Sequence, residues 1–369
     1  MKNNSPLVKI IGVGGCGCNT VSSIEEKYAG KLNENFEFYG VDTDFISLKN
    51  QTVRNKVEIG STGIGTAKDR MLGAQAAQES ADKLREMLKG ADIVILCAGL
   101  SGGTGSGSTG VIAHLAASEG GAVVMASVTL PFYYDDVRKQ EAAQDALKSI
   151  KEEVPVVMPV TNGEGVENED VPFLEVLRAT DNNVICLIEM INIVVNRAGY
   201  ENLDFSELIK VASTSGDAMI GIGEAKGEQG LSLAINLARS TKSGSLTLKD
   251  AQRVALITLT SPNVSFKQIK DARLVLQNEI SRQTEVYNGL YVDNDQEGAK
   301  VILFATGINS QKEIPSSVVE QTEAGPMKQY EIGFLAVEEG RFKDTAPTYI
   351  AGINYDKPTF IRKGVLIEK

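Results

Sequence analysis

The chain has 369 residues, of which 42% are apolar and 23% charged, a composition typical of a globular protein of about two domains. Its 37 basic and 48 acidic residues give a net charge of −11, which excludes nucleic acid and anionic lipid as expected ligands of the folded body. Four cysteines and a single histidine, His114, are too few for a closed metal centre or a Ser-His-Asp site, so no metal ligands are predicted.

Short apolar runs alternate with helical patterns through the first half of the chain, which predicts an α/β fold. Fully apolar runs such as DIVILCA need helices on both faces and therefore predict a mostly parallel, Rossmann-like sheet. One long helix is expected from Lys68 to Lys89 and ends at Gly90. Strands are expected at Leu7 to Val13, Phe36 to Val41, Asp92 to Ala98, Ala122 to Thr129 and Val154 to Val160.

The second half begins with the apolar stretch Val184 to Val195, which is too short to span a bilayer and predicts a central helix packed on all sides. A second, smaller α/β unit with a mixed sheet follows Gly199. Its expected helices are 206–214, 227–240 and 266–282, and its expected strands are 218–223, 253–261, 286–293 and 300–306. Beyond Gly307 the apolar runs are weak, which predicts a mobile extension. The predicted parts are thus 1–180, the central helix 181–200, 201–308 and the tail 309–369.

Two features favour a reducing, cytoplasmic setting. Cys16 and Cys18 are interpreted as reduced thiols among glycines rather than as a disulfide or a metal site. The N-terminus leads directly into the apolar run at Leu7, with no export signal before it.

The first glycine-rich segment, GVGGCGCNT from Gly12 to Thr20, lies between a predicted strand and a helix. Its Gly12, Gly14 and Gly17 have the G-x-G-x-x-G spacing of dinucleotide-binding turns, and Asp42 ends the next strand. An NAD-dependent oxidoreductase is therefore one alternative.

A second glycine segment, SGGTGSG from Ser101 to Gly107, also follows an apolar strand and precedes a helix expected at 108–118. Backbone N–H groups of small residues, helix N-termini and the hydroxyls of Thr104 and Ser106 can bind several phosphates without lysine. Two such turns at neighbouring strand ends are more than a dehydrogenase needs.

SGGTGSG, with its surroundings from Ala98 to Ala113, resembles the glycine signature of the tubulin/FtsZ superfamily in its bacterial FtsZ form. The resemblance implies a GTP-binding domain, a central helix, a second domain and head-to-tail assembly into cytoskeletal filaments at the bacterial division site. Other segments match in the same order: GVGGCGCN, VDTD (41–44), TGIGTAKDRMLGAQAA (62–77), VTLPFYYDD (128–136), NLDF (202–205), GIGEAKGE (221–228), ATGI (305–308) and DKPTFIRK (356–363).

The resemblance also implies which positions hold GTP or GDP, and phosphoryl transfer adds an expected Mg²⁺. Phosphate positions are Gly14, Gly15, Gly17, Asn19, Asp42, Gly102, Gly103, Thr104, Gly105, Ser106 and Gly107, with Gly63, Gly65, Thr66 and Ala67 beside the γ-phosphate. Ribose and base positions are Asp135, Lys139, Asn162, Leu177, Asn182 and Asn183. Asn182 is interpreted as replacing the usual aspartate and Leu177 the usual stacking phenylalanine, so the base preference stays open.

Hydrolysis is assigned by the resemblance to acids that the next subunit in the filament supplies, within GYENLDFSEL (199–208). The expected catalytic residues are Asn202, Asp204 and Glu207. Glu207 stands in place of the usual aspartate and Asp42 in place of the usual asparagine, which predicts slow turnover. A filament scaffold that binds nucleotide with little hydrolysis is therefore a second alternative.

The tail carries a further expectation. DKPTFIRK, Asp356 to Lys363, resembles the short peptide through which this family docks on membrane-tethering adaptors such as FtsA, with Phe360 and Ile361 as apolar anchors. The expected partners are thus further copies of the chain and an adaptor, with no nucleic acid and no direct membrane insertion.

Overall fold

The computed structural model describes residues 5–164, 166, 170–227, 229–240, 246–294, 296–308, 349–350 and 353–354. Residues 1–314 form one compact unit and residues 315–369 a second. In the second unit the described residues form the short antiparallel strands β11 (Tyr349–Ile350) and β12 (Ile353–Asn354). The predicted adaptor peptide Asp356 to Lys363 lies outside the described residues.

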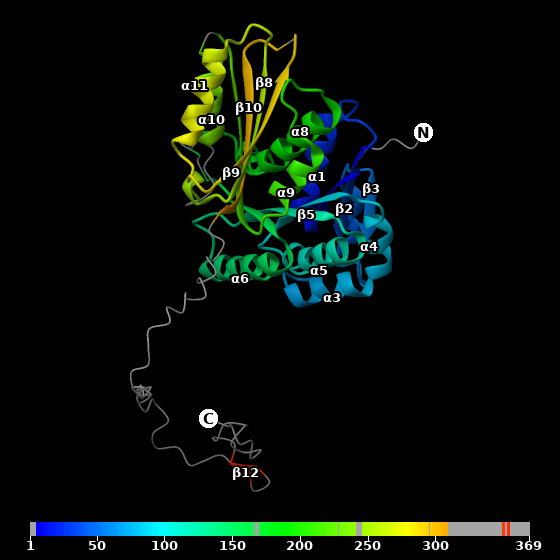
Figure 1. The fold of residues 1–369 in the computed structure, drawn as a ribbon. Helices are drawn as coiled ribbons and strands as arrows, with labels where there is room; N and C mark the ends of the chain where they lie inside the picture. The colour runs from blue at the N-terminus through cyan, green and yellow to red at the C-terminus, as the bar shows by residue number, and fades with distance from the viewer. Residues whose placement is uncertain are drawn as a thin grey trace, which may run out of the picture. The chain divides into compact units, whose positions relative to one another are not determined.

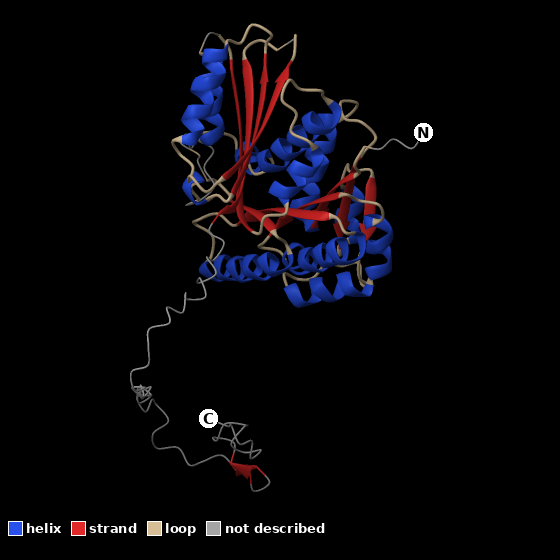
Figure 2. Ribbon diagram, viewed as in Figure 1, coloured by secondary structure: helices blue, strands red, loops and turns tan. Residues whose placement is uncertain are grey.

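One sheet of ten strands runs through the first unit in the order β3-β2-β1-β4-β5-β6-β7-β10-β8-β9. Figures 1 and 2 show how its strands and helices are arranged. Neighbours from β3 to β7 are parallel, whereas β10 is antiparallel to both β7 and β8. The predicted, mostly parallel α/β sheet is therefore confirmed. The strands are β1 (Val8–Val13), β2 (Phe36–Asp42), β3 (Asn55–Glu58), β4 (Ile93–Gly99), β5 (Val123–Leu130), β6 (Val156–Thr161), β7 (Gly216–Ala225), β8 (Arg253–Thr260), β9 (Glu285–Val292) and β10 (Ala299–Ile308).

Helices cover both faces of this sheet, as fully apolar strands require (Figure 2). The core on one face includes α3 to α6, the core on the other includes α1, α8 and α9, and α10 and α11 cover the outer face of β7, β10 and β8. The helices are α1 (Gly14–Tyr28), α2 (Phe45–Asn50), α3 (Arg70–Glu79), α4 (Ala81–Leu88), α5 (Gly103–Gly120), α6 (Val137–Glu153), α7 (Phe173–Ala179), α8 (Asn182–Asn196), α9 (Phe205–Ala212), α10 (Gly230–Arg239) and α11 (Phe266–Gln277).

The predicted central helix is α8, and it is shared by both halves of the sheet. Val184, Leu187 and Ile191 are fully buried in a core that also contains Ile10 of β1 and Ile257 of β8. Because the sheet continues from β6 to β7, no gap in strand pairing marks the expected domain boundaries, which stay predictions. In the described part of the chain, no helix is long and apolar enough to cross a membrane.

Three predicted helices differ most from the structure. The single helix expected from Lys68 to Lys89 is two helices, because Ser80 leaves the helical conformation and accepts a hydrogen bond from the backbone of Gly60. The helix expected at 108–118 already begins at Gly103, so most of the second glycine segment is its first turn. The helix expected to reach 282 ends at Gln277, where Asn278 caps it.

Candidate functional site

The two glycine turns lie side by side at the carboxyl edge of the sheet. β1 and β4 are parallel neighbours that pair Val13 with Ala98, so α1 and α5 begin next to each other. A β-carbon on Gly14 would lie 3.0 Å from the backbone nitrogen of Gly105, and Gly14 has a φ of 71° that favours glycine. Two helix N-termini at this edge of a parallel sheet form a favourable place for phosphate groups.

The glycines of the second turn have two different roles. A β-carbon on Gly103 would lie 2.3 Å from Oγ1 of Thr66, and one on Gly107 would lie 2.0 Å from the carbonyl oxygen of Arg70. These glycines therefore allow α5 to pack closely against α3 and the segment before it. Gly102, in contrast, has no described atom within 4 Å of such a β-carbon, so its backbone faces open space where a ligand can approach.

The segment before α3 connects the end of β2 to the second glycine turn. Gly65 donates its backbone N–H to the carbonyl of Thr43 at 3.1 Å, and the hydroxyls of Thr43 and Thr104 lie 2.7 Å apart. Ala67 and Lys68 have φ values of 48° and 68°, in the left-handed region that costs energy for residues with a β-carbon. This strained backbone lies beside the second glycine turn, and its contact with the γ-phosphate stays a prediction.

Asp42 faces the first glycine turn from the end of β2. Its side chain is 4% exposed, and a β-carbon on Gly15 would lie 4.0 Å from its Oδ2. Burial raises the pKa of Asp42, although Oδ1 accepts backbone hydrogen bonds from Thr43 and Asp44. Among the described residues there is no group of three His, Cys, Asp or Glu side chains that could hold a metal ion.

Asp135, Lys139 and Asn162 follow the next two strands, β5 and β6. Nζ of Lys139 lies 2.9 Å from Oδ2 of Asp135, and this contact lowers the pKa of the carboxyl. Oδ1 of Asn162 is buried and has no hydrogen-bond partner among the described residues. A buried acceptor without a partner is costly, so this oxygen is available to a hydrogen-bond donor. Leu177 is half-buried on α7.

Asp181, which the sequence did not single out, is the buried carboxylate at the start of α8. It is 5% exposed, and Oδ1 accepts a hydrogen bond at 2.7 Å from the hydroxyl of Thr20 on α1. Burial raises the pKa of Asp181 to about 6. The side chain of Asn182, which the sequence favoured, is exposed, and Asn183 is buried. The available signal was a carboxylate directly before a mostly apolar helix.

Asn202, Asp204 and Glu207 lie before and within the first turn of α9. Asp204 and Glu207 form a capping box: each carboxylate accepts the backbone N–H of the other residue, at 2.9 and 3.1 Å. Oδ1 of Asn202 accepts from the backbone of Gly199 at 2.6 Å. The hydrogen bond from Ser206 lowers the pKa of Asp204, which is exposed at the surface.

α8 separates these acids from the glycine turns of the same chain. It has 15 residues, which corresponds to a length of about 22 Å. It begins next to Asp181, whereas its last residue, Asn196, accepts a hydrogen bond at 2.8 Å from Asn33. Because Asn33 lies just before β2, α8 ends at the amino edge of the sheet. The acids that follow α8 therefore lie far from the two glycine turns of the same chain.

Residues 7–167 match the model of the Tubulin/FtsZ family, GTPase domain. Cell division protein FtsZ 1 of Pyrococcus horikoshii is 30% identical over 325 residues, which cover 85% of this chain and 86% of that relative. Cell division protein FtsZ of Pseudomonas aeruginosa is 28% identical over 330 residues, with 88% and 82% covered.

Solved structures with the same fold include an FtsZ dimer from M. jannaschii, with a TM-score of 0.72 at 23% identity over 83% of this chain and 89% of that one. The GTPγS-bound protofilament of CetZ2 from Haloferax volcanii has a TM-score of 0.68 at 21% identity, over 83% and 94%. The family match decides against the dinucleotide interpretation of the first glycine turn. The chain belongs to the tubulin/FtsZ family and carries its GTPase domain.

Proposed function

We propose that this chain is a self-assembling cytoskeletal GTPase of cell division, which hydrolyses GTP at the contact between successive subunits. Its relatives are cell division proteins, and one neighbouring structure is a protofilament. The observation that carries the proposal is the separation of the glycine turns from Asp204 and Glu207 by the length of α8. A complete site then needs two subunits, and a head-to-tail contact that does not close on itself produces a filament.

Within one subunit, the two glycine turns would hold the phosphates and Asp42 would assist Mg²⁺. We assign recognition of guanine to Asp181 rather than to Asn182, because Asp181 is buried beside α1 and Asn182 is exposed. A carboxylate accepts hydrogen bonds from both N1–H and the N2 amine of guanine, which an amide oxygen does less well. Oδ1 of Asn162 is a further acceptor for a ligand donor.

The adjoining subunit would supply the groups that orient the attacking water. The lowered pKa of Asp204 keeps its carboxylate charged at neutral pH. The hydrogen bonds of the capping box use Oδ1 of Asp204 and Oε2 of Glu207, which leaves the second oxygen of each carboxylate for the neighbour. Loss of the γ-phosphate would then weaken the contact through the segment at Gly65 to Lys68, which is a switch in population between assembled and free subunits.

The test measures phosphate release per subunit over a range of protein concentrations, beside sedimentation with GTP and with GDP. We expect the rate to rise steeply above a threshold concentration and the polymer to depend on GTP. A near-zero rate with normal sedimentation would favour the scaffold alternative. A rate per subunit that is independent of concentration would contradict a shared site.

A further inference from the structure

The segment that leads into the acid-bearing helix α9 is fixed to β9 through the backbone. Tyr200 donates its N–H to the carbonyl of Leu290 at 2.8 Å, and Leu290 donates to the carbonyl of Glu201 at 2.8 Å. The carboxylate of Glu201 also pairs with Arg273 of α11. These contacts fix the position of the N-terminal end of α9. The direction of the helix then depends on the contacts at its C-terminal end.

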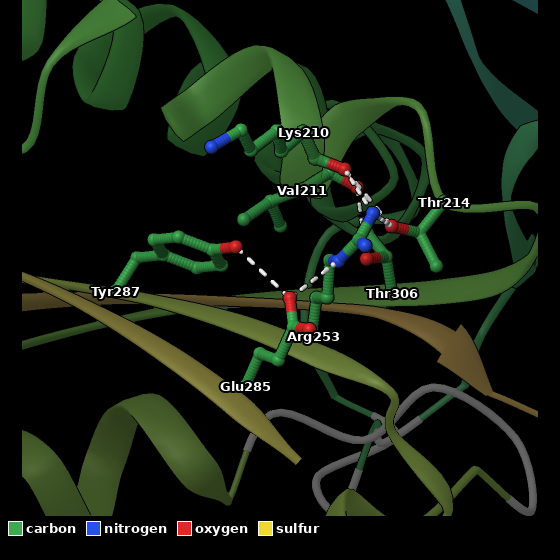
Figure 3. Close-up of polar contacts among 7 residues, drawn as sticks. All are labelled: Lys210, Val211, Thr214, Arg253, Glu285, Tyr287 and Thr306. Carbon is green, nitrogen blue, oxygen red and sulfur yellow. Dashed lines mark hydrogen bonds and ion pairs between the residues drawn. The ribbon is translucent and has the colours of Figure 1, made fainter. Parts of the chain in front are cut away.

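Side chains from β8 and β10 hold the C-terminal end of α9 (Figure 3). Nη1 of Arg253 donates to the carbonyl of Lys210 at 3.1 Å and to Oγ1 of Thr214 at 3.0 Å. The hydroxyl of Thr306 donates to the carbonyl of Val211 at 2.9 Å. The last carbonyls of a helix have no partner within it and carry partial negative charge, so a guanidinium is favourable at this position.

Arg253 is itself oriented by the neighbouring strand β9. Its Nε donates to Oε2 of Glu285 at 2.9 Å, and the hydroxyl of Tyr287 donates to the same oxygen at 2.9 Å (Figure 3). Arg253 and Glu285 are direct partners in the pairing of β8 with β9. The hydrogen bond from Arg253 lowers the pKa of Glu285, which keeps this carboxylate charged. The guanidinium is thus fixed between the sheet and the end of α9.

This network orients α9 but contributes little to the free energy of folding. The side chains of Arg253 and Glu285 are 33% and 56% exposed, and ion pairs at such exposure contribute little to the free energy of folding. The helix is kept on the sheet by Leu208, Val211 and Ala212, which are at most 1% exposed. Losing the guanidinium would therefore leave α9 in place but free to tilt.

We propose that Arg253 is a positioning residue for hydrolysis at the subunit interface, because it orients α9 so that Asp204 and Glu207 meet the nucleotide of the adjoining subunit. The inference rests on the proposed function. Release of the C-terminal end lets α9 tilt about its fixed N-terminal end, and carboxylates that lie about 6 Å from the helix axis then move by about 1 Å for a tilt of about 10°. A misplacement of about 1 Å can lower a reaction rate on the order of a hundredfold.

The test compares GTP turnover of Arg253→Met and the wild type well above the assembly threshold, with the rate expressed per sedimented subunit. We expect kcat to fall about ten- to a hundredfold, while KM for GTP and the sedimented fraction stay near wild type. Arg253→Lys retains a cation at the helix end and should recover part of the rate. A wild-type rate for Arg253→Met, or a loss explained entirely by less polymer, would overturn the inference.

Arg239→Met is the matched control, because Arg239 forms an ion pair with Glu279 that joins α10 to the end of α11. It should retain the wild-type rate, and an equal loss in this variant would overturn a specific role for Arg253. If Arg253→Met does not fold, Glu285→Gln releases Arg253 from β9 and should lower the rate by a smaller factor. A wild-type rate for Glu285→Gln would then count against the inference. Failure of the proposed function is distinguishable, because the wild type would then show no concentration threshold.

Discussion

Burial of the charged Asp181 carboxylate costs free energy, and no contact within the nucleotide-free subunit fully compensates for it. Its pKa is raised from 3.8 to about 6 because burial disfavours the charged carboxylate, and the hydroxyl of Thr20 compensates only in part. A buried carboxylate that stays charged at neutral pH is typical of a functional group whose partner arrives with the ligand. This is the physical reason to assign guanine recognition to this residue.

The first prediction concerns binding. Asp181→Asn should weaken the affinity for GTP about ten- to a hundredfold, because the amide accepts one of the two guanine hydrogen bonds in place of a charged acceptor. Asn182→Ala is the control and should bind GTP like the wild type, since the Asn182 side chain is exposed. Equilibrium titration of monomeric protein with a labelled GTP analogue measures both. The reverse order of effects would show that Asn182 reads the base.

The second prediction concerns pH and stability without nucleotide. Because the folded-state pKa of Asp181 lies above the value of 3.8 expected for the unfolded chain, this group favours folding below pH 3.8, and the contribution is lost as the pH rises through about 6. Asp181→Asn should therefore stabilise the nucleotide-free protein at pH 7.5 by up to about 3 kcal/mol, and by less at pH 5. Urea unfolding at the two pH values measures the difference. An equal effect at both would exclude titration of Asp181 as the cause.

At the scale of elements, the contact between α3 and α5 shapes the second glycine turn. A β-carbon on Gly73 of α3 would lie 2.3 Å from the carbonyl oxygen of Gly103, where α5 begins. Backbone meets backbone at this point, so neither side can move away by changing a side-chain rotamer. The position of the turn that would hold phosphate therefore depends on a glycine in a different helix.

The third prediction tests this contact. Gly73→Ala should lower the free energy of unfolding by about 1–3 kcal/mol and weaken nucleotide binding, because the added methyl group pushes α3 away from the start of α5. Gly110→Ala lies in α5, where a β-carbon would meet only the Cγ of Glu153 at 3.7 Å, and should stabilise the helix by about 0.5–1 kcal/mol. Thermal unfolding with and without GTP compares them. Equal stability of the two variants would contradict the argument.

The elements themselves were largely predictable from hydrophobic patterns, since each expected strand overlaps one in the structure. The break at Ser80 was not, because it depends on a hydrogen bond to Gly60, which is distant in the sequence. The start of α5 inside SGGTGSG was also not predictable from propensity, because glycine disfavours helices and only close packing explains it. The burial of Asp181 is likewise set by α1, which packs beside it in the fold.

At the scale of the whole molecule, the two parts of the proposed site lie beyond opposite ends of α8. The sequence resemblance predicted that one region binds the nucleotide and another supplies the acids. The length of α8 gives this separation a physical basis.

The fourth prediction follows from a site shared by two molecules. Asp204→Asn retains a good N-cap for α9 but removes the charge, so the monomer should bind GTP normally and the assembled protein should lose turnover about a hundredfold. Mixed with the wild type, it should lower the rate of the wild-type subunits beside it. Asp82→Asn, an exposed acid in the first turn of α4, is the control. Weaker GTP binding by monomeric Asp204→Asn would contradict the shared site.

The separation of the two parts of the site by α8 also determines how many complete sites a short oligomer contains. When each subunit offers its turns at one end and its acids at the other, a row of n subunits holds n − 1 completed centres, and a lone subunit holds none. One terminus of the row always keeps a nucleotide that no acid reaches, while the opposite terminus displays acids with nothing to act on. The two ends of the row are therefore chemically different. GTP is hydrolysed at the contacts inside the row, while the nucleotide at one end stays unhydrolysed.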